Sequence, residues 1–164
     1  MQKLHSKFVL SKFDIKSGFW QIQIHPKDRY KIAFTVLFSQ YEWNIMPFGL
    51  KNALSEFQRI MNVIFNPYSR FYIIYTDNVL IFSNSLEQQF KHLLTFFYLA
   101  NKNGLFISKT KISLFQTHIR FLGHYISQGT ITLIERFITF TCKFPNIILD
   151  KNQMQRLLGS LSYV

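Results

Sequence analysis

A chain of 164 residues has the length of one domain, and its hydrophobic content of 48% is enough to bury a core. The 19 lysines and arginines outnumber the 8 aspartates and glutamates, and the formal net charge of +11 favours a polyanionic partner such as nucleic acid, with a solvated basic surface as the alternative. The single cysteine, Cys142, excludes an internal disulfide and a multi-cysteine zinc site, and we expect it to be a small buried residue.

The sequence contains no apolar run suited to membrane insertion or export. No stretch approaches the roughly 18 apolar residues that cross a bilayer. Residues 1–7 lack the apolar segment of a secretory signal. We therefore expect an intracellular chain, cytoplasmic or nuclear, that is neither secreted nor attached to a membrane.

The first expected elements are strands. Residues 8–14 form a strand-like run that closes on the acidic residue Asp14. Residues 22–24 alternate in polarity, residues 31–36 are rich in strand-forming types, and the proline-containing stretch 25–28 between them is suited to a turn. The pattern predicts a hairpin over residues 22–36.

A helix is expected next, over residues 47–65, and Pro67 would end it. Apolar residues recur there at intervals of three and four, which is typical of an amphipathic helix. Its inner face would carry Leu50, Ala53, Leu54, Phe57, Ile60, Met61 and Ile64.

Residues 71–82 contain two short apolar runs separated by Thr76, Asp77 and Asn78. This pattern predicts a tight β-hairpin with an acidic residue at its tip. Asp14 is expected to end a strand in the same way, so two strands would each deliver a carboxylate to one end of a sheet. Such a pair suggests a two-metal site.

The remaining elements alternate in kind. Residues 86–100 predict a second helix that ends at Asn103-Gly104. Residues 119–126 predict a strand, and residues 134–164 a helical tail interrupted at Pro145. Helices interspersed with antiparallel hairpins predict an α+β fold. The inner face of the second helix would carry Phe90, Leu93, Leu94, Phe97 and Tyr98.

Five segments, taken in order, resemble the motifs of one family, the reverse transcriptases of plant pararetroviruses and gypsy-type retrotransposons. The residues in these segments most resemble those of an endogenous caulimovirus-like polyprotein. The segments are residues 13–21 (FDIKSGFWQ), residues 41–53 (YEWNIMPFGLKNA) with 57–59 (FQR), residues 75–78 (YTDN), residues 121–124 (FLGH) and residues 150–159 (DKNQMQRLLG).

The resemblance implies an RNA-directed DNA polymerase domain. Residues 1–133 would form the palm, an antiparallel sheet with packed helices, and an incomplete fingers region. Residues 134–164 would begin the thumb. The partners implied are an RNA or DNA template with its primer and dNTPs, and the cofactor is a pair of Mg²⁺ ions, with Mn²⁺ as an alternative. The remaining fingers and a ribonuclease H segment are expected in a longer polyprotein.

The resemblance also implies roles for single residues. Asp14 and Asp77 would be the catalytic metal ligands, together with the backbone carbonyl of Ile15. Lys111 would donate a proton to pyrophosphate, with Lys109 as the rival candidate. The residues implied in substrate binding are Ile15, Phe19 (beneath the deoxyribose), Phe48, Gly49 and Gln58, and those of the primer grip are Phe121, Leu122 and Gly123.

The chain departs from the family pattern at three places. Asn78 stands where the family has a second aspartate, Leu54 replaces a proline, and residues 37–39 replace a Pro-Phe-Gly turn. An amide brings no negative charge to a metal site, so we expect the activity of this copy to be impaired.

Two alternatives remain open at this point. One is a non-catalytic nucleic-acid-binding remnant that stacks bases on Trp20, Tyr41 and Trp43. The other is an inert, poorly folding remnant.

Overall fold

The computed structural model describes residues 8–135, 139, 147–148 and 150–161. The expectations for Cys142 and for the interruption at Pro145 fall outside the described residues. In the described part of the chain, no helix is both long and apolar enough to cross a membrane.

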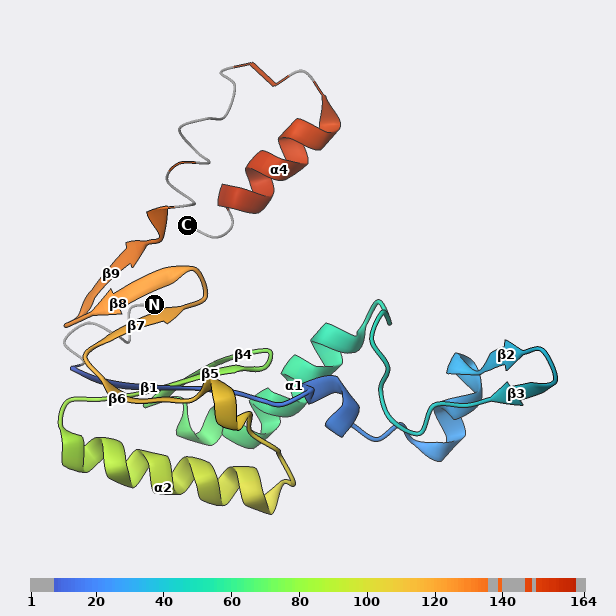
Figure 1. Ribbon diagram of the computed structural model, residues 1–164, viewed down its shortest axis with the longest axis horizontal. Coiled ribbons are helices and arrows are strands. Elements are labelled where there is room, and N and C mark those ends of the chain that lie inside the picture. Colours follow the sequence, from blue (N-terminus) through green and yellow to red (C-terminus); the bar gives the residue numbers. More distant parts are fainter. Residues whose placement is uncertain (1–7, 136–138, 140–146, 149, 162–164) are drawn as a thin grey trace.

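A four-stranded antiparallel sheet, in the order β4-β5-β1-β6, forms the centre of the fold (Figure 1). Both predicted strands that end near an aspartate are present in it, and so is the predicted hairpin with Asp77 at its tip. The strands are β1 (Val9–Asp14), β4 (Tyr72–Tyr75), β5 (Asn78–Ser83) and β6 (Ser113–Gln116).

Each face of this sheet is covered by a separate apolar cluster, because successive side chains of a strand point to opposite faces. Helices α1 (Ala53–Phe65) and α2 (Leu86–Lys102) cover one face (Figure 1). A second sheet covers the other face and consists of β7 (His118–Phe121), β8 (His124–Ser127) and β9 (Thr130–Leu133). Because both faces of the sheet are buried, β1 and β5 have a fixed position and a fixed pairing register. The ends of these two strands lie at the two aspartates. The helix side holds Phe13, Val79, Ile81, Phe57, Met61 and Phe96, and the sheet side holds Leu10, Leu80, Phe82, Ile119, Phe121 and Ile126.

The hairpin predicted over residues 22–36 is wrong. Residues Pro26–Ile32 form a 3-10 helix, η3, which the Nδ1 of His25 caps by accepting a hydrogen bond from Lys27 N. The real hairpin joins β2 (Phe34–Val36) to β3 (Ser39–Tyr41) and extends away from the sheet as an arm (Figure 1). Proline pre-sets the backbone for a helical turn, which overrode the strand-like composition.

The first helix begins at Ala53 and not at residue 47. Residues before it form turns, and Gly49 has φ +90°, a value outside the helical region. Leu50, which lies before the helix, and Leu54 are both exposed, although the residue pattern placed them inside.

The second helix forms as predicted and ends at Lys102, with Asn103 as its C-cap and Gly104 at φ +67°. The predicted inner face is wrong at four of five positions. Leu93 is buried, but Phe90, Leu94, Phe97 and Tyr98 are exposed. The buried residues are instead Gln89, Leu93, Phe96, Leu99 and Ala100.

The single strand predicted over residues 119–126 is two strands. β7 (His118–Phe121) and β8 (His124–Ser127) pair through a turn at Leu122 and Gly123, where φ is +47° and +77°, and β9 (Thr130–Leu133) completes the sheet. The tail contains α4 (Lys151–Leu161), as the helical pattern predicted. An α+β fold is therefore confirmed.

Candidate active site

The two aspartates lie at the same end of the central sheet. Asp14 is the last residue of β1 and pairs across the sheet with Asn78, the first residue of β5. Just beyond this pair, the N–H of Ile15 donates to the backbone oxygen of Asp77 at 2.7 Å. The sequence predicted that both aspartates lie at one end of a sheet, and they do: Asp14 ends β1, and Asp77 lies in the turn between β4 and β5, the neighbour of β1.

Backbone geometry also orients Ile15. In an extended segment the N–H and C=O of one residue point to the same side. Lys16 N and Asp14 O both bond to residues 106–108, on one side, while Ile15 N faces the Asp77 turn, on the other. The Ile15 carbonyl therefore points toward the Asp77 side.

The turn that carries Asp77 has a strained backbone and is held in place by hydrogen bonds. Thr76 has φ +52°, in the left-handed region that a β-branched residue seldom adopts. Its N–H donates to Gln58 Oε1 at 2.6 Å, and its hydroxyl donates to Asp77 Oδ1 at 2.8 Å. These bonds fix the direction of the Asp77 side chain.

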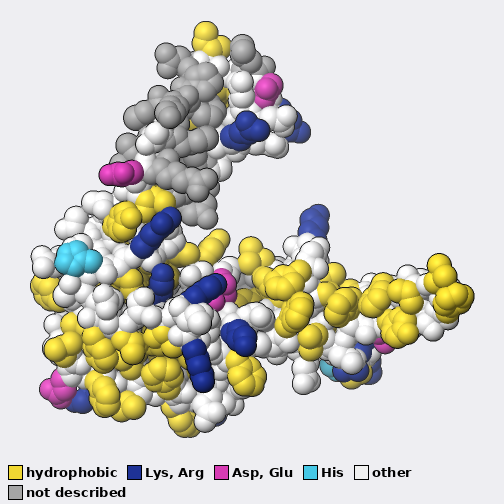
Figure 2. All heavy atoms as spheres, viewed as in Figure 1, with side chains coloured by type: hydrophobic (Ala, Val, Ile, Leu, Met, Phe, Trp, Pro, Cys, Tyr) yellow, Lys and Arg dark blue, Asp and Glu magenta, His cyan; other side chains and the backbone are white. Residues whose placement is uncertain are grey.

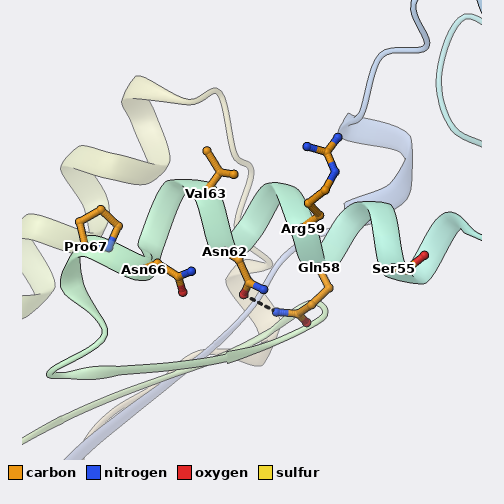
Figure 3. Close-up of a pocket in the computed structure, with 7 residues that line it drawn as sticks. All are labelled: Ser55, Gln58, Arg59, Asn62, Val63, Asn66 and Pro67. Carbon is orange, nitrogen blue, oxygen red and sulfur yellow. Dashed lines mark hydrogen bonds between the residues drawn. The ribbon is translucent and has the colours of Figure 1, made fainter.

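Gln58 therefore lies behind the turn. Its Nε2 donates to Asn62 Oδ1 at 2.9 Å and to Ile74 O at 3.4 Å, and Figure 3 shows its side chain leaving α1 toward the β4–β5 strands. It does not line the pocket that contains the aspartates; it lines a shallow hollow on α1 with Arg59 and Asn62.

Asn78 contacts the Asp77 carboxylate. Its Nδ2 donates to Asp77 Oδ1 at 3.1 Å. The amide thus acts here as a donor to the carboxylate, whereas an aspartate at this position would repel it. Among the described residues, no three His, Cys, Asp or Glu side chains gather as a metal-binding group.

Lys111 is the cation closest to the Asp14 carboxylate. It ends the 3-10 helix η5 (Lys109–Lys111), and its Nζ lies 3.2 Å from Asp14 Oδ2. The Asp14 side chain is 15% exposed and that of Lys111 is 64% exposed, so the lysine can move away while the carboxylate stays in place. Lys111 lines the pocket described next, and Lys109 does not.

A pocket of about 250 Å³ brings most of the predicted residues together. Phe19 and Phe48 form part of its wall, with their rings edge to face at a centroid distance of 5.4 Å. The residues from the sequence prediction that line it are Asp14, Ile15, Phe19, Phe48, Asp77 and Lys111, and the others are Ser17, Gly18, Leu54, Phe57 and Thr76.

Gly18 is a site residue that the roles assigned from sequence did not include. A Cβ at this position would lie 2.6 Å from the Phe57 ring, so only glycine fits between the ring and the pocket. The signal was present in the sequence, because Gly18 belongs to the first motif segment. Thr76 was also missed, since its contact with Gln58 joins two distant segments.

The remaining predicted residues lie outside this pocket. Gly49 follows Phe48, and an added Cβ there would meet nothing within 4 Å. The Phe121 side chain is buried between the two sheets, and Leu122 and Gly123 form the β7–β8 turn. Lys12 Nζ donates to Arg120 O at 3.2 Å and links β1 to this second sheet.

The donor set fits a divalent cation. Two carboxylates and a backbone carbonyl directed to the same side are hard oxygen donors, the type that Mg²⁺ and Mn²⁺ take. The net negative charge of the pocket is modest, because the carboxylates of Asp14 and Asp77 are partly offset by the ammonium group of Lys111.

Comparisons with known proteins show which family the chain belongs to. Residues 1–126 match the family model described as reverse transcriptase (RNA-dependent DNA polymerase). The chain is 41% identical over 160 residues to the enzymatic polyprotein of Cauliflower mosaic virus (strain D/H), covering 98% of the chain and 24% of the polyprotein. It is 40% identical over 156 residues to the genome polyprotein of Petunia vein clearing virus (isolate Shepherd), covering 95% of the chain and 7% of the polyprotein.

Solved structures show the same fold. The foamy viral protease-reverse transcriptase in complex with an RNA/DNA hybrid superposes with a TM-score of 0.74 at 20% identity, over 99% of this chain and 22% of that one. A form of the foamy viral protein in complex with double-stranded DNA gives a TM-score of 0.78 at 23% identity, over 99% of this chain and 28% of that one. The chain thus spans about a quarter of the length of the Cauliflower mosaic virus and foamy viral proteins, and 7% of the Petunia vein clearing virus polyprotein.

Proposed function

The chain belongs to the reverse transcriptase (RNA-dependent DNA polymerase) family, and from this premise we propose that the pocket beside Asp14 and Asp77 is a site of nucleotidyl transfer. The observation that carries the proposal is the gathering of six predicted residues from four separate segments in one pocket. In this proposal residues 1–133 form the palm and part of the fingers, and residues 134–164 begin the thumb.

Reverse transcriptases use divalent metal ions. In this chain Asp14, Asp77 and the carbonyl of Ile15 would hold them, as a pair of Mg²⁺ ions or, as an alternative, Mn²⁺. When bound, such ions activate a primer hydroxyl and stabilise the leaving pyrophosphate.

The protein's own groups supply binding and proton transfer. The Lys111 ammonium carries a proton at the mouth of the pocket and would pair with the negative charge of a leaving pyrophosphate. Phe19 is positioned by edge-to-face contacts with Phe48 and with Phe57, each at 5.4 Å. A ring held in this way would sit beneath the sugar of a dNTP and exclude a 2′-hydroxyl.

The proposed nucleic-acid partner is an RNA or DNA template with its primer. The net charge of +11 favours a polyanion. In this proposal the half-buried β7–β8 turn at Leu122 and Gly123 contacts the primer, while Phe48 and Gly49 border the incoming base. The further fingers and ribonuclease H segments would belong to a longer polyprotein.

Asn78 lowers the activity in this proposal. It removes one negative charge from the metal site and donates a hydrogen bond to the Asp77 carboxylate, which competes with a cation for that oxygen. A loss of about 3 to 5 kcal/mol of transition-state stabilisation would slow the reaction by roughly 10²- to 10⁴-fold.

Primer extension on an RNA template with Mg²⁺ and dNTPs tests the proposal. Native chain, Asn78→Asp and Asn78→Asp combined with Asp77→Asn are compared. We expect extension by Asn78→Asp at about 10² times the native rate or more, and none when Asp77 is also replaced. Equal rates for the native chain and Asn78→Asp would contradict the role of Asn78. Extension that survives Asp77→Asn would contradict the site.

A further inference from the structure

The side chain of Gln21 joins two segments that lie far apart in the sequence. Gln21 is the last residue of the 3-10 helix η2 (Gly18–Gln21), which follows Asp14. Its Nε2 donates to the backbone oxygen of Phe106 at 3.1 Å and also to that of Lys16. Its Oε1 accepts from Phe106 N at 2.9 Å. One carboxamide therefore makes three hydrogen bonds to backbone groups, and two of them hold the segment around residue 106.

These partners require a carboxamide at position 21. The backbone groups ask for a donor and an acceptor on the same side chain. A glutamate would lose the two donated bonds, a lysine would lose the accepted one, and an asparagine is one methylene shorter. Gln21 is half-buried, where a polar group needs such partners.

The segment that Gln21 holds leads directly to Lys111. Residues 106–108 run beside the end of β1, where Ser108 N donates to Asp14 O at 2.9 Å. Ser108 is the N-cap residue of η5, and Lys111 is its last residue. The Phe106 side chain is 69% exposed, so backbone bonds and not packing hold this residue. The position of η5 therefore depends on those bonds.

The η2 side of this connection has support of its own. Within η2, Trp20 N donates to Ser17 O at 2.9 Å. The ring of Phe19 packs edge to face on that of Phe57 at a centroid distance of 5.4 Å. Since η2 is anchored independently, the Gln21 side chain can fix the segment that precedes η5 relative to it.

Several cations share this face of the molecule. Figure 2 shows Lys and Arg side chains gathered around an acidic side chain, over the region where β1 and β6 lie in Figure 1. Lys109 belongs to the same 3-10 helix as Lys111 but does not line the pocket. The backbone position of η5 therefore determines which ammonium group faces Asp14.

We propose that Gln21 is a positioning residue for Lys111. By fixing the backbone that leads into η5, it keeps the Lys111 ammonium beside Asp14, where Nζ lies 3.2 Å from Oδ2. The inference rests on the proposed function, in which Lys111 gives a proton to the leaving pyrophosphate and must lie within reach of it. Gln21 does not line the pocket, so it acts through Lys111.

Zero-length cross-linking with a water-soluble carbodiimide tests this positioning without any catalytic activity. The reagent joins a carboxylate to an amine that contacts it, so the Asp14–Lys111 product, measured by peptide mass spectrometry, reports their proximity. Gln21→Met has a similar length and lacks both hydrogen-bonding groups, and it should lower the yield at least about fivefold relative to the native chain. Gln23→Met is the matched control and should leave the yield unchanged, because Gln23 is exposed.

Circular dichroism checks that each variant folds. Gln21→Asn keeps the amide on a shorter side chain and should give a similar loss of the cross-linked product. Equal yields from the native chain and Gln21→Met would overturn the proposal, and so would a native chain that forms no Asp14–Lys111 product.

A double-mutant cycle in Asn78→Asp tests whether Gln21 acts through Lys111. We expect Gln21→Met and Lys111→Met each to slow primer extension at saturating dNTP by about tenfold or more, with little change in the KM for dNTP. In the chain that already carries Lys111→Met, Gln21→Met should slow extension by less than about twofold.

The outcomes of this cycle separate the two proposals. A further tenfold loss from Gln21→Met in the chain that lacks Lys111 would show that Gln21 supports the fold alone, contrary to the inference. Absence of Mg²⁺-dependent extension in Asn78→Asp would contradict the proposed function, and the cross-linking yields would then decide whether Gln21 positions Lys111.

Discussion

The central sheet and the β2–β3 arm are held in place by different interactions. In β5, the five residues after Asn78 are all buried, whereas all six residues of β2 and β3 are exposed. The arm is held by ring contacts, with Phe34 stacked on Tyr41 at 5.9 Å and tilted against Trp43 at 5.5 Å. A sheet that is buried on both faces can hold two carboxylates within a narrow range of positions. An arm held by surface contacts leaves its own position less constrained.

The largest expected contrast between the two regions is in core packing. Phe57→Ala should lower the free energy of unfolding by about 3 to 5 kcal/mol, because Phe57 is fully buried between the sheet and Gly18. Phe34→Ala in the arm is the matched control and should cost about 1 kcal/mol or less. Urea denaturation measures both. Equal losses would show that the arm contributes to the core as the sheet does.

A smaller effect is expected at the turn beneath the candidate site. Gln58→Leu leaves the Thr76 N–H without its acceptor and should lower the free energy of unfolding by about 1 to 3 kcal/mol. Gln58→Leu should also make the hydrogen exchange of the Thr76 amide faster. Gln58→Glu keeps an acceptor oxygen and should preserve the slow exchange. Equal exchange rates in Gln58→Leu and the native chain would show that this bond does not hold the turn.

The smallest effect is expected at Asp28, in the 3-10 helix η3 that precedes the arm. Lys31 Nζ donates to Asp28 Oδ1 at 2.6 Å, and this bond lowers the pKa of the Asp28 carboxyl below its ordinary value. Because the folded pKa is lowered, the pair stabilises the fold above the unfolded pKa, and this contribution is lost as the pH falls through the folded pKa. The pair is exposed, so the effect on unfolding should be slight. NMR titration should show the Asp28 carboxyl returning toward its ordinary pKa in Lys31→Met, and an unchanged pKa would show that the ion pair does not form.

The sequence located the two aspartates because each ends an apolar run, and such runs become neighbouring strands of a buried sheet. Resemblance to the family added Ile15, Phe19, Phe48 and Lys111, all of which line one pocket with the aspartates. These residues could be predicted because their places depend on strand ends and short local motifs.

Other features depend on contacts between distant segments and were missed. The Gln58–Thr76 bond joins α1 to a turn 18 residues later, and no local pattern signals it. Alternating polarity over residues 22–24 suggested a strand, but the capped turn at Pro26 formed a 3-10 helix instead. The inner face of α2 was mistaken because Gln89, a polar residue, is buried and donates to Ser11 Oγ and Ile81 O, which leaves larger apolar residues outside.

The proposal that Asp14 and Asp77 together hold a divalent cation is tested most directly by NMR titration with Mn²⁺, which broadens the signals of nearby amides. We expect the amides of Asp14, Ile15 and Asp77 to broaden first, those of β2 and β3 to stay sharp, and Asp77→Asn to remove the early broadening. If Asp77→Asn broadens at the same amides and the same Mn²⁺ concentration as the native chain, the two carboxylates do not form the site.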